Sequence, residues 1–344
     1  MNAWLIQFNA KLNLMKKLFR IVVWTGLAVL LLIFGFFTLV QITWDNAIDA
    51  PYPDIRATSD PAVIARGEYL VYGPSHCAVC HVSMDRMLDV DNGLKLPLTG
   101  GFEEVIPGFG IIRAPNLTPD EETGIGRLTD GEIARSLRHM VSSDGRPLFP
   151  FMEFQEMSDE DLTAIISYLR SLEPVRNQVK PTEYTFMGKA LLAFGLFKAK
   201  GPDVTPPVSI TPDTTIAYGR YLAHDVANCR SCHTSMDNQG NPTGPDFSGG
   251  FVFHPTEWSQ GYTFVSPNIT PHETSGIMAH WTEEVFINRF RAGRAYERSH
   301  MPWGSYSRMS DDDLKAIYRY LQSLDPVDNK VARTVYFPGE HPGQ

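Results

Sequence analysis

The hydrophobic and polar positions of this chain form one long apolar run near the N-terminus, followed by several short amphipathic stretches. Residues 21–40 contain no charged side chain, and a helix of this length crosses the hydrocarbon core of a bilayer. Basic residues precede the run, whereas Asp45, Asp49 and Asp54 follow it. The positive-inside rule therefore predicts a single-pass anchor, with residues 1–20 in the cytoplasm and the rest of the chain outside.

A cleaved secretory signal is the alternative interpretation of this apolar run. The apolar region of such a signal is usually shorter and ends at a cleavage site with small residues. Here Phe36, Phe37 and Leu39 stand where small residues are needed, so we favour an uncleaved anchor. Because Met15 and the two following lysines resemble a conventional start, residues 1–14 are either a short cytoplasmic tail or lie before the true start.

The amphipathic stretches predict helices at both ends of two similar halves. Residues 61–71 and 215–223 carry apolar side chains among polar ones. Further along each half, Ser158 and Ser310 are typical helix N-caps followed by acidic residues, and apolar residues then recur three or four positions apart. We expect the first helix of each half to pack against the last.

Strands are expected to be minor, because no segment alternates apolar and polar residues over several positions. The longest stretches without helical periodicity are residues 82–114 and 234–266, which are rich in Gly and Pro. We expect them to form long loops, which are uncommon unless they are functional or packed on something.

Two motifs of the form C-x-x-C-H contain all four cysteines of the chain. They are Cys77-Ala-Val-Cys80-His81 and Cys229-Arg-Ser-Cys232-His233. Two thiols one helical turn apart can each form a thioether with a haem vinyl group, while the adjacent histidine reaches the iron. The motifs therefore predict two covalently attached haem c groups, with His81 and His233 as the proximal iron ligands.

A zinc site and a redox-active dithiol are the competing interpretations of C-x-x-C. The knuckles of one zinc ribbon lie a short distance apart in sequence, but these two motifs are 152 residues apart. A thioredoxin-like motif occurs in a βαβ context and does not require the histidine that follows each second cysteine. Haem attachment is the interpretation that uses every residue of the motif.

The same offset of 152 residues relates other segments, which indicates an internal duplication. Pro-Asn-Leu-Thr-Pro at 115–119 returns as Pro-Asn-Ile-Thr-Pro at 267–271. The duplication predicts two domains of similar size, at 61–178 and 211–330. The remaining predicted segments are the cytoplasmic region 1–20, the anchor 21–40, a linker at 41–60, an interdomain linker at 179–210 and a tail at 331–344.

Composition and charge restrict the classes of partner. Hydrophobic residues make up 43% and charged residues 20% of the chain, as in globular proteins. The formal net charge of −9 excludes nucleic acid as a natural partner and suits a basic docking protein. Between the halves, the apolar stretch 186–200 is either an amphipathic helix that touches the membrane or a partner, or a segment packed between domains, and we favour packing.

Together these motifs resemble the class I cytochrome c superfamily, and more closely the tandem-haem cytochromes that serve membrane-bound dehydrogenases of the alcohol type. The resemblance rests on both C-x-x-C-H motifs, both Pro-Asn-x-Thr-Pro segments and both Ser-Asp-x-Asp-Leu helix starts, and it covers about residues 61–328. It implies an all-α fold, with two tandem cytochrome c domains after an N-terminal transmembrane helix. Alcohol dehydrogenase cytochrome subunits often carry three haems, whereas this chain has two motifs.

The resemblance also implies further haem contacts. Similar cytochromes place their axial methionine in a Met-Pro-Trp/Tyr segment, which makes Met301 the expected ligand in the second half. In the first half the expected ligand is Met152, although Glu153 replaces the proline, and Met84, Met87, Met140 and His139 compete with it. Asn116 and Asn268 are expected either to bind a haem propionate or to fix the loop that carries them.

A haem iron with histidine and methionine on its two faces transfers electrons and excludes oxygen and peroxide. We therefore expect an electron carrier in the bacterial inner membrane, with its haem domains on the periplasmic side. Its donor would be a dehydrogenase or a quinol-oxidising complex, and its acceptor another cytochrome or a terminal oxidase. The alternative is a dihaem peroxidase, which needs one haem with an accessible or displaceable distal ligand.

Overall fold

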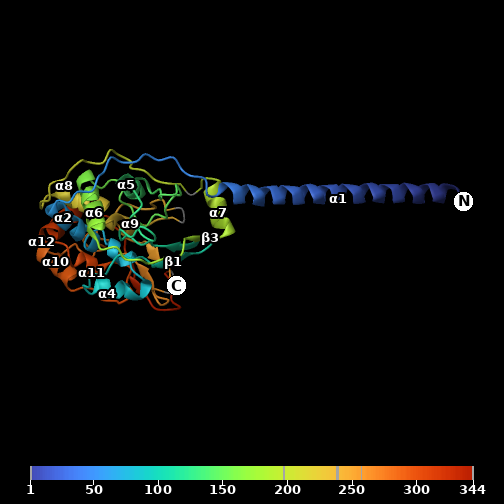
Figure 1. The fold of residues 1–344 in the computed structure, drawn as a ribbon. Coiled ribbons are helices and arrows are strands. Elements are labelled where there is room, and N and C mark those ends of the chain that lie inside the picture. Colours follow the sequence, from blue (N-terminus) through green and yellow to red (C-terminus); the bar gives the residue numbers. More distant parts are fainter. Residues whose placement is uncertain (1, 197, 238–239, 257, 343–344) are drawn as a thin grey trace. The chain divides into compact units, whose positions relative to one another are not determined.

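The computed structural model describes residues 2–196, 198–237, 240–256 and 258–342. Within these ranges the chain is mainly helical and forms two compact units (Figure 1). Unit 1 consists of Met1–Ala47, Ile106–Gly110 and Tyr184–Lys198, and unit 2 consists of Ile48–Val105, Ile111–Glu183 and Ala199–Gln344.

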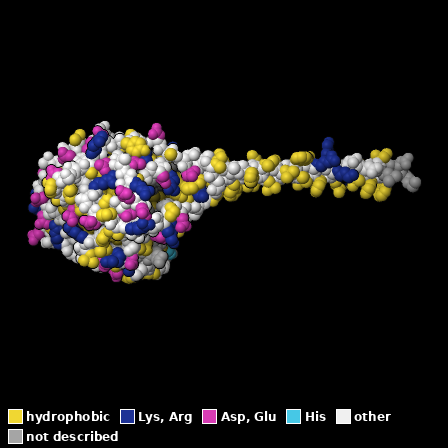
Figure 2. All heavy atoms as spheres, in the orientation of Figure 1, with side chains coloured by type: hydrophobic (Ala, Val, Ile, Leu, Met, Phe, Trp, Pro, Cys, Tyr) yellow, Lys and Arg dark blue, Asp and Glu magenta, His cyan; other side chains and the backbone are white. Residues whose placement is uncertain are grey.

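Unit 1 is built around the long helix α1 (Asn2–Thr43) and the short helix α7 (Phe186–Ala193). Within α1, Ile6–Thr43 is long and apolar enough to cross a membrane, with a mean hydropathy of 2.4 in its most apolar window and none of that window buried. Figure 2 shows hydrophobic side chains along α1, with its Lys and Arg side chains gathered towards the N-terminal end. The expected long apolar helix is therefore present.

Unit 2 contains the other described helices, which occur in two sets of similar order. The first set is α2 (Pro61–Tyr72), α3 (Cys77–Cys80), the 3-10 turn η1 (Met84–Arg86), α4 (Met87–Asp91), α5 (Asp130–His139) and α6 (Asp159–Ser171). The second set is α8 (Ile216–Tyr221), the π-helical turn η2 (Leu222–Val226), α9 (Cys229–His233), α10 (Glu283–Arg291), α11 (Trp303–Tyr306) and α12 (Asp311–Gln322). The N-caps predicted at Ser158 and Ser310 each accept a hydrogen bond from the third residue of the helix that follows.

The first and last helices of each half pack closely, as the apolar spacing predicted. Helix α2 lies against α6, and α8 lies against α12. A glycine permits each contact: a Cβ on Gly67 would lie 1.9 Å from the Ala164 carbonyl oxygen, and a Cβ on Gly219 would lie 1.9 Å from that of Ala316. Both positions require glycine because the backbone of the facing helix lies where a Cβ atom would be.

Six short strands among the described residues correct the expectation of an all-α fold. Strands β1 (Glu103–Ile106), β2 (Gly110–Arg113) and β3 (Glu183–Tyr184) form one sheet in that order, and β4 (Val252–Phe253), β5 (Thr263–Val265) and β6 (Val335–Tyr336) form a second. In the second sheet neighbouring strands are antiparallel, with Val252 opposite Val265 and Phe264 opposite Val335. Two to four residues are too few to show alternation, so the pattern missed these strands.

The two stretches expected to be long loops are therefore interrupted. The segment 82–114 contains η1, α4, β1 and β2, and the segment 234–266 contains β4 and β5. Each regular element is short; η1 continues directly into α4, and the other elements are separated by segments that contain glycine. The hydrophobic pattern identified the irregular character of these stretches but not the elements within them.

The two halves of unit 2 contact each other through a reciprocal pair of hydrogen bonds. The Tyr69 hydroxyl donates to the Asp313 carboxylate at 2.5 Å, and the Tyr221 hydroxyl donates to the Asp161 carboxylate at 2.7 Å. Each hydroxyl also accepts from the backbone N–H of the N-cap serine of the facing half. Since these residues are related by the 152-residue offset, the contact has the self-complementary form of a two-fold interface.

Candidate haem sites

The C-x-x-C-H motifs occupy matching positions, directly after a sharp change in backbone direction. His76 precedes α3 with φ 41°, and Asn228 precedes α9 with φ 51°. Both residues are in the left-handed region, which costs free energy for a side chain with a Cβ and is kept only where the surroundings fix it. Each C-x-x-C-H helix thus begins directly after a residue with left-handed backbone.

Each proximal histidine is oriented by the same backbone contact. His81 Nδ1 lies 2.9 Å from the Pro115 carbonyl oxygen, and His233 Nδ1 lies 3.0 Å from that of Pro267. A carbonyl only accepts, so Nδ1 carries the proton and Nε2 keeps its lone pair. Burial lowers the pKa of both imidazoles, which favours the neutral form that binds a metal. This arrangement matches the ring orientation found in metal-ligating histidines.

The predicted asparagines hold the loops that carry these carbonyls. Asn268 Nδ2 donates to the Val327 carbonyl at 2.7 Å, while Asn268 Oδ1 accepts from the backbone N–H of Thr270 at 2.9 Å. Asn116 makes the matching contacts with Val175 and Thr118 at 2.8 and 2.9 Å. Each amide thus joins its loop, next to the proline that orients the histidine, to the segment that follows the last helix of the same half.

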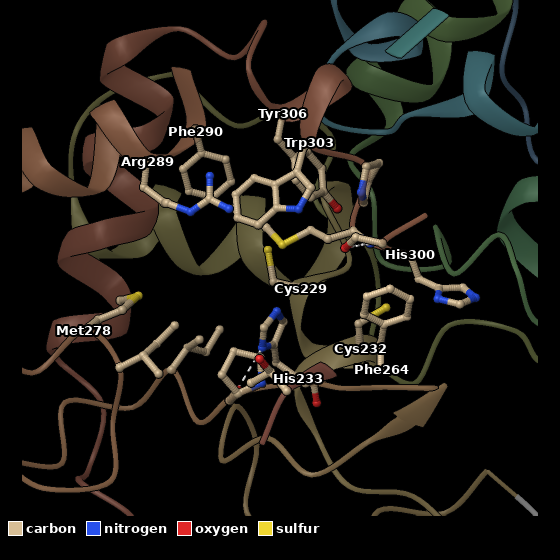
Figure 3. Close-up of a pocket in the computed structure, with 18 of the residues that line it drawn as sticks. Cys229, Cys232, His233, Phe264, Met278, Arg289, Phe290, His300, Trp303 and Tyr306 are labelled. Atoms are coloured by element: carbon tan, nitrogen blue, oxygen red, sulfur yellow. Dashed lines mark hydrogen bonds between the residues drawn. The ribbon is translucent and has the colours of Figure 1, made fainter. Parts of the chain in front are cut away.

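A cavity of about 350 Å³ surrounds the second motif (Figure 3). Its walls include Cys229, Cys232, His233 and the expected axial ligand Met301. In Figure 3, His233 and Trp303 lie on opposite sides of the space. The wall also contains Met278, Phe264, Phe286, Phe290, Tyr306 and Arg289.

These residues fit a covalently attached haem. The cavity brings two thiols, an imidazole with Nε2 available and a thioether sulfur to one apolar space, which is the donor set of a c-type haem with histidine and methionine ligands. Aromatic and aliphatic side chains dominate the remaining wall and would exclude water. Sequence alone had assigned all four of these donor residues.

In the first half, Cys77 and Met152 both pack against the hydrophobic cluster of unit 2. The competing residues Met87 and Met140 are buried, at 6% and 2% exposure, whereas Met152 is only partly buried. Cys80 lies at the end of α3, and His81 follows it directly. The ligand role of Met152 stays a prediction.

The cysteine environments do not suit a redox-active dithiol. Burial raises the pKa of the Cys80 thiol to about 11 and that of the Cys229 thiol to about 12. Reactive cysteines have the opposite shift, because a nearby positive charge or helix N-terminus stabilises the thiolate. This shift favours the protonated form of both thiols near neutral pH.

Two arginines that the sequence interpretation missed hold the segments between the expected methionine ligands and the last helices. Arg291, at the end of α10, donates to the Ser307 and Met309 carbonyls at 2.6 and 2.7 Å. Arg138, at the end of α5, contacts the Gln155 carbonyl at 2.7 Å and also the Met157 carbonyl. Their similar positions near the ends of matching helices are the only sequence signal for this role that we identify.

Arg289 is a further missed residue, and it lines the cavity itself. Its guanidinium carbon lies 3.7 Å from the centre of the Trp303 ring, and one of its N–H groups donates to the Gly293 carbonyl. Desolvation lowers the pKa of this guanidinium. A cation at an apolar wall is suited to pair with a haem carboxylate. No sequence motif around Arg289 predicts this role.

The segments that follow the two expected methionine ligands differ in length. Five residues separate Met152 from Ser158, whereas eight separate Met301 from Ser310, and these eight include helix α11. In the shorter segment, Glu153 accepts a hydrogen bond from Ser231, which lies between the two cysteines of the second motif. The unusual residue beside Met152 therefore contacts the haem-attachment helix of the other half.

Comparison with known proteins supports this assignment. Residues 216–321 match the family described as cytochrome c oxidase, cbb3-type, subunit III. The chain is 28% identical over 288 residues to the cytochrome c subunit of quinone-dependent alcohol dehydrogenase from Gluconobacter oxydans, covering 78% of this chain and 56% of that protein. It is 27% identical over 323 residues to the gluconate 2-dehydrogenase cytochrome c subunit from Pantoea cypripedii, covering 90% and 67%.

A shorter relative matches almost end to end. The "Diheme cytochrome c-type" protein of Cereibacter sphaeroides is 26% identical over 285 residues, which cover 78% of this chain and 91% of that protein. By contrast, the chain spans a little over half the length of the alcohol dehydrogenase subunit. The expected resemblance is confirmed: residues 216–321 match a cytochrome c family model, and most of the chain is similar to cytochrome c subunits of dehydrogenases.

Proposed function

We propose that this chain is a membrane-anchored c-type cytochrome with two haem groups, which carries electrons between a periplasmic dehydrogenase or quinol-oxidising complex and a downstream cytochrome or oxidase. The observation that carries the proposal is the repeated C-x-x-C-H helix, in which each histidine contacts a proline carbonyl through Nδ1 and keeps Nε2 for iron. When bound, haem iron supplies one-electron redox chemistry.

The residues of the second site have distinct tasks in this function. Cys229 and Cys232 would hold the cofactor covalently, and His233 and Met301 would ligate its iron. A thioether ligand favours ferrous iron and so raises the reduction potential relative to two imidazoles. Arg289, at the edge of the apolar wall, would pair with a carboxylate of the cofactor.

The first site has the matching set Cys77, Cys80, His81 and Met152. We assign the two haem domains to residues 61–178 and 211–330. The reciprocal tyrosine and aspartate contacts hold the two halves in one compact unit, which supports transfer of an electron between the sites without diffusion of separate proteins. Asn116 and Asn268 act by fixing the loops behind the histidines.

The relatives support a dehydrogenase as the donor. Their names describe cytochrome subunits of alcohol, gluconate and fructose dehydrogenases. We infer that the haem domains lie on the periplasmic side of the inner membrane, since α1 has its basic residues before its apolar run. These names give no support to the peroxidase alternative.

A pair of conservative substitutions tests the electron-carrier assignment. Met301→Leu keeps the side-chain volume but removes the sulfur, so the second haem should become high spin and lose its sulfur-to-iron absorption band. Met278→Leu is the matched control, because Met278 is a second methionine of the same cavity wall. Low-temperature electron paramagnetic resonance of the ferric protein, before and after addition of peroxide, compares the haem spin states of the wild type and both variants.

The outcomes separate the two candidate functions. Low-spin signals from both haems of the wild type, unchanged by peroxide and altered only by Met301→Leu, are expected of the carrier. A wild-type haem that is high spin and reacts with peroxide would instead indicate a peroxidase. An unchanged spectrum in Met301→Leu, with a changed one in Met278→Leu, would move the axial ligand to Met278.

A further inference from the structure

Unit 1 holds helix α7 against the outward end of α1, and we propose that α7 is a lipid-binding element that lies in the outer interface of the bilayer that α1 crosses. The lipid-facing surface consists of Met187 on α7 and of Phe194 and Leu196, which follow the helix. The inference rests on the proposed membrane anchor and goes beyond it, because it assigns a second segment, about 145 residues away in the sequence, to the membrane surface.

Aromatic contacts fix the depth of α7 along α1. The rings of Phe37 and Phe186 are stacked with centroids 4.3 Å apart, and those of Phe36 and Phe194 are stacked at 5.8 Å. Phe37 is three residues from the end of the apolar run at Val40, which is about 5 Å along a helix. If α1 spans the bilayer, the side chains that touch Phe36 and Phe37 lie at the hydrocarbon boundary.

The residues next to this boundary are those preferred at membrane interfaces. The Trp44 and Tyr184 rings lie 5.4 Å apart, and Lys189 Nζ lies 4.7 Å from the centre of the Trp44 ring. Tryptophan and tyrosine concentrate at the level of lipid headgroups, where a lysine directs its ammonium to the phosphates. Residues 184–198 contain two lysines and no acidic residue, which complements those phosphates.

The lipid-facing surface is apolar and exposed within the part of the chain that the structure describes. Met187 is 59% exposed, Phe194 is 49% exposed and Leu196 is 75% exposed. This surface continues the apolar surface of α1, whose spanning window has no buried part. A bilayer that covers α1 to the end of its apolar run would therefore cover these side chains as well.

Helix α7 is held rigidly in this place by the loop Ile106–Gly110. Thr185 caps the helix by accepting from the Gly188 N–H at 3.0 Å, and its own N–H donates to the Phe109 carbonyl at 2.9 Å. A Cβ on Gly188 would lie 2.1 Å from the Phe109 carbonyl oxygen, so the loop packs directly against the helix backbone. The lipid-facing surface is thus presented by a packed element of unit 1.

Thiol labelling of the full chain in liposomes of phosphatidylethanolamine and phosphatidylglycerol tests the inference. A membrane-impermeant maleimide is applied to Met187→Cys, to Leu31→Cys within the apolar run of α1, and to Val208→Cys, which is 71% exposed in unit 2. The native cysteines are blocked as thioethers, and the wild type measures any remaining background. Val208→Cys reports the fraction of protein with unit 2 outside the liposome.

We expect Val208→Cys to react up to its outward-facing fraction, and Met187→Cys and Leu31→Cys to react at least tenfold more slowly until detergent and denaturant dissolve the membrane and unfold the chain. If Met187→Cys reacts as fast as Val208→Cys while Leu31→Cys stays protected, the anchor stands and the inference is wrong, with a protein partner as the remaining occupant. If Leu31→Cys reacts fully as well, the proposed anchor fails and the inference fails with it.

Discussion

Asp91 joins the first half of unit 2 to the segment that carries Met301. Its Oδ1 accepts a hydrogen bond from the Gly304 N–H at 2.7 Å, and its Oδ2 is paired with the Arg294 guanidinium. The Asp91 and Arg294 side chains are only 4% and 12% exposed. A Cβ on Gly304 would lie 1.8 Å from the Asp91 carbonyl oxygen, so α11 is docked directly on this residue.

Asp91→Asn removes the charge but keeps the shape, and it should destabilise the protein substantially. Removing one partner of a buried ion pair costs roughly 3–5 kcal/mol, because the other charge is left unpaired. Asparagine still accepts one hydrogen bond, and Arg294 still contacts the Ser299 carbonyl, so we expect a loss of about 2–3 kcal/mol in the free energy of unfolding.

Asp89→Asn is the matched control for this prediction. Asp89 lies two residues before Asp91 and pairs with Arg86, but the Asp89 and Arg86 side chains are 40% and 47% exposed, and exposed pairs contribute about 0–1 kcal/mol. Guanidinium unfolding of the haem-loaded protein, followed by haem absorbance, compares the two variants. Equal stability of Asp91→Asn and Asp89→Asn would refute the assignment of a structural ion pair between the halves.

Two further predictions concern the helix contacts of unit 2. Gly67→Ala should lower the free energy of unfolding by at least about 2 kcal/mol, because its Cβ would overlap the Ala164 carbonyl. Gly131→Ala is the control: its Cβ would have its nearest neighbours at 3.6 Å, so this substitution should be nearly neutral. Tyr69→Phe should cost about 1.5–3 kcal/mol, because the buried Asp313 carboxylate loses its hydroxyl donor, and Tyr221→Phe should cost a similar amount. Thermal unfolding of each variant measures these losses. A Gly67→Ala or Tyr69→Phe variant as stable as the wild type would contradict the packing described.

The sequence predicted the features that depend on local spacing. The two C-x-x-C-H helices, the apolar helix α1 and the caps at Ser158 and Ser310 are all present, because each follows from neighbouring residues. The pairing of the first and last helix in each half is also confirmed. The ligand assignment of Met301 is supported by a position in the same cavity as His233.

Features that depend on distant contacts were not predicted. Strands of two to four residues are stabilised by their neighbours in the sheet and leave no periodic signal. The Asp91–Arg294 pair joins residues about 200 positions apart, and nothing in either local sequence identifies its partner. Sequence composition favoured packing between domains for residues 186–200. That α7 packs on α1 is seen from the structure, in the ring contacts with Phe36 and Phe37.

The central claim is that both C-x-x-C-H motifs carry covalent haem. The most direct test is the mass of the purified full chain under denaturing conditions, together with a titration of its free thiols and the haem content from the pyridine haemochrome spectrum. The account predicts two haem groups per chain and no titratable thiol among the four cysteines. A chain without added haem mass and with four reactive thiols would contradict it.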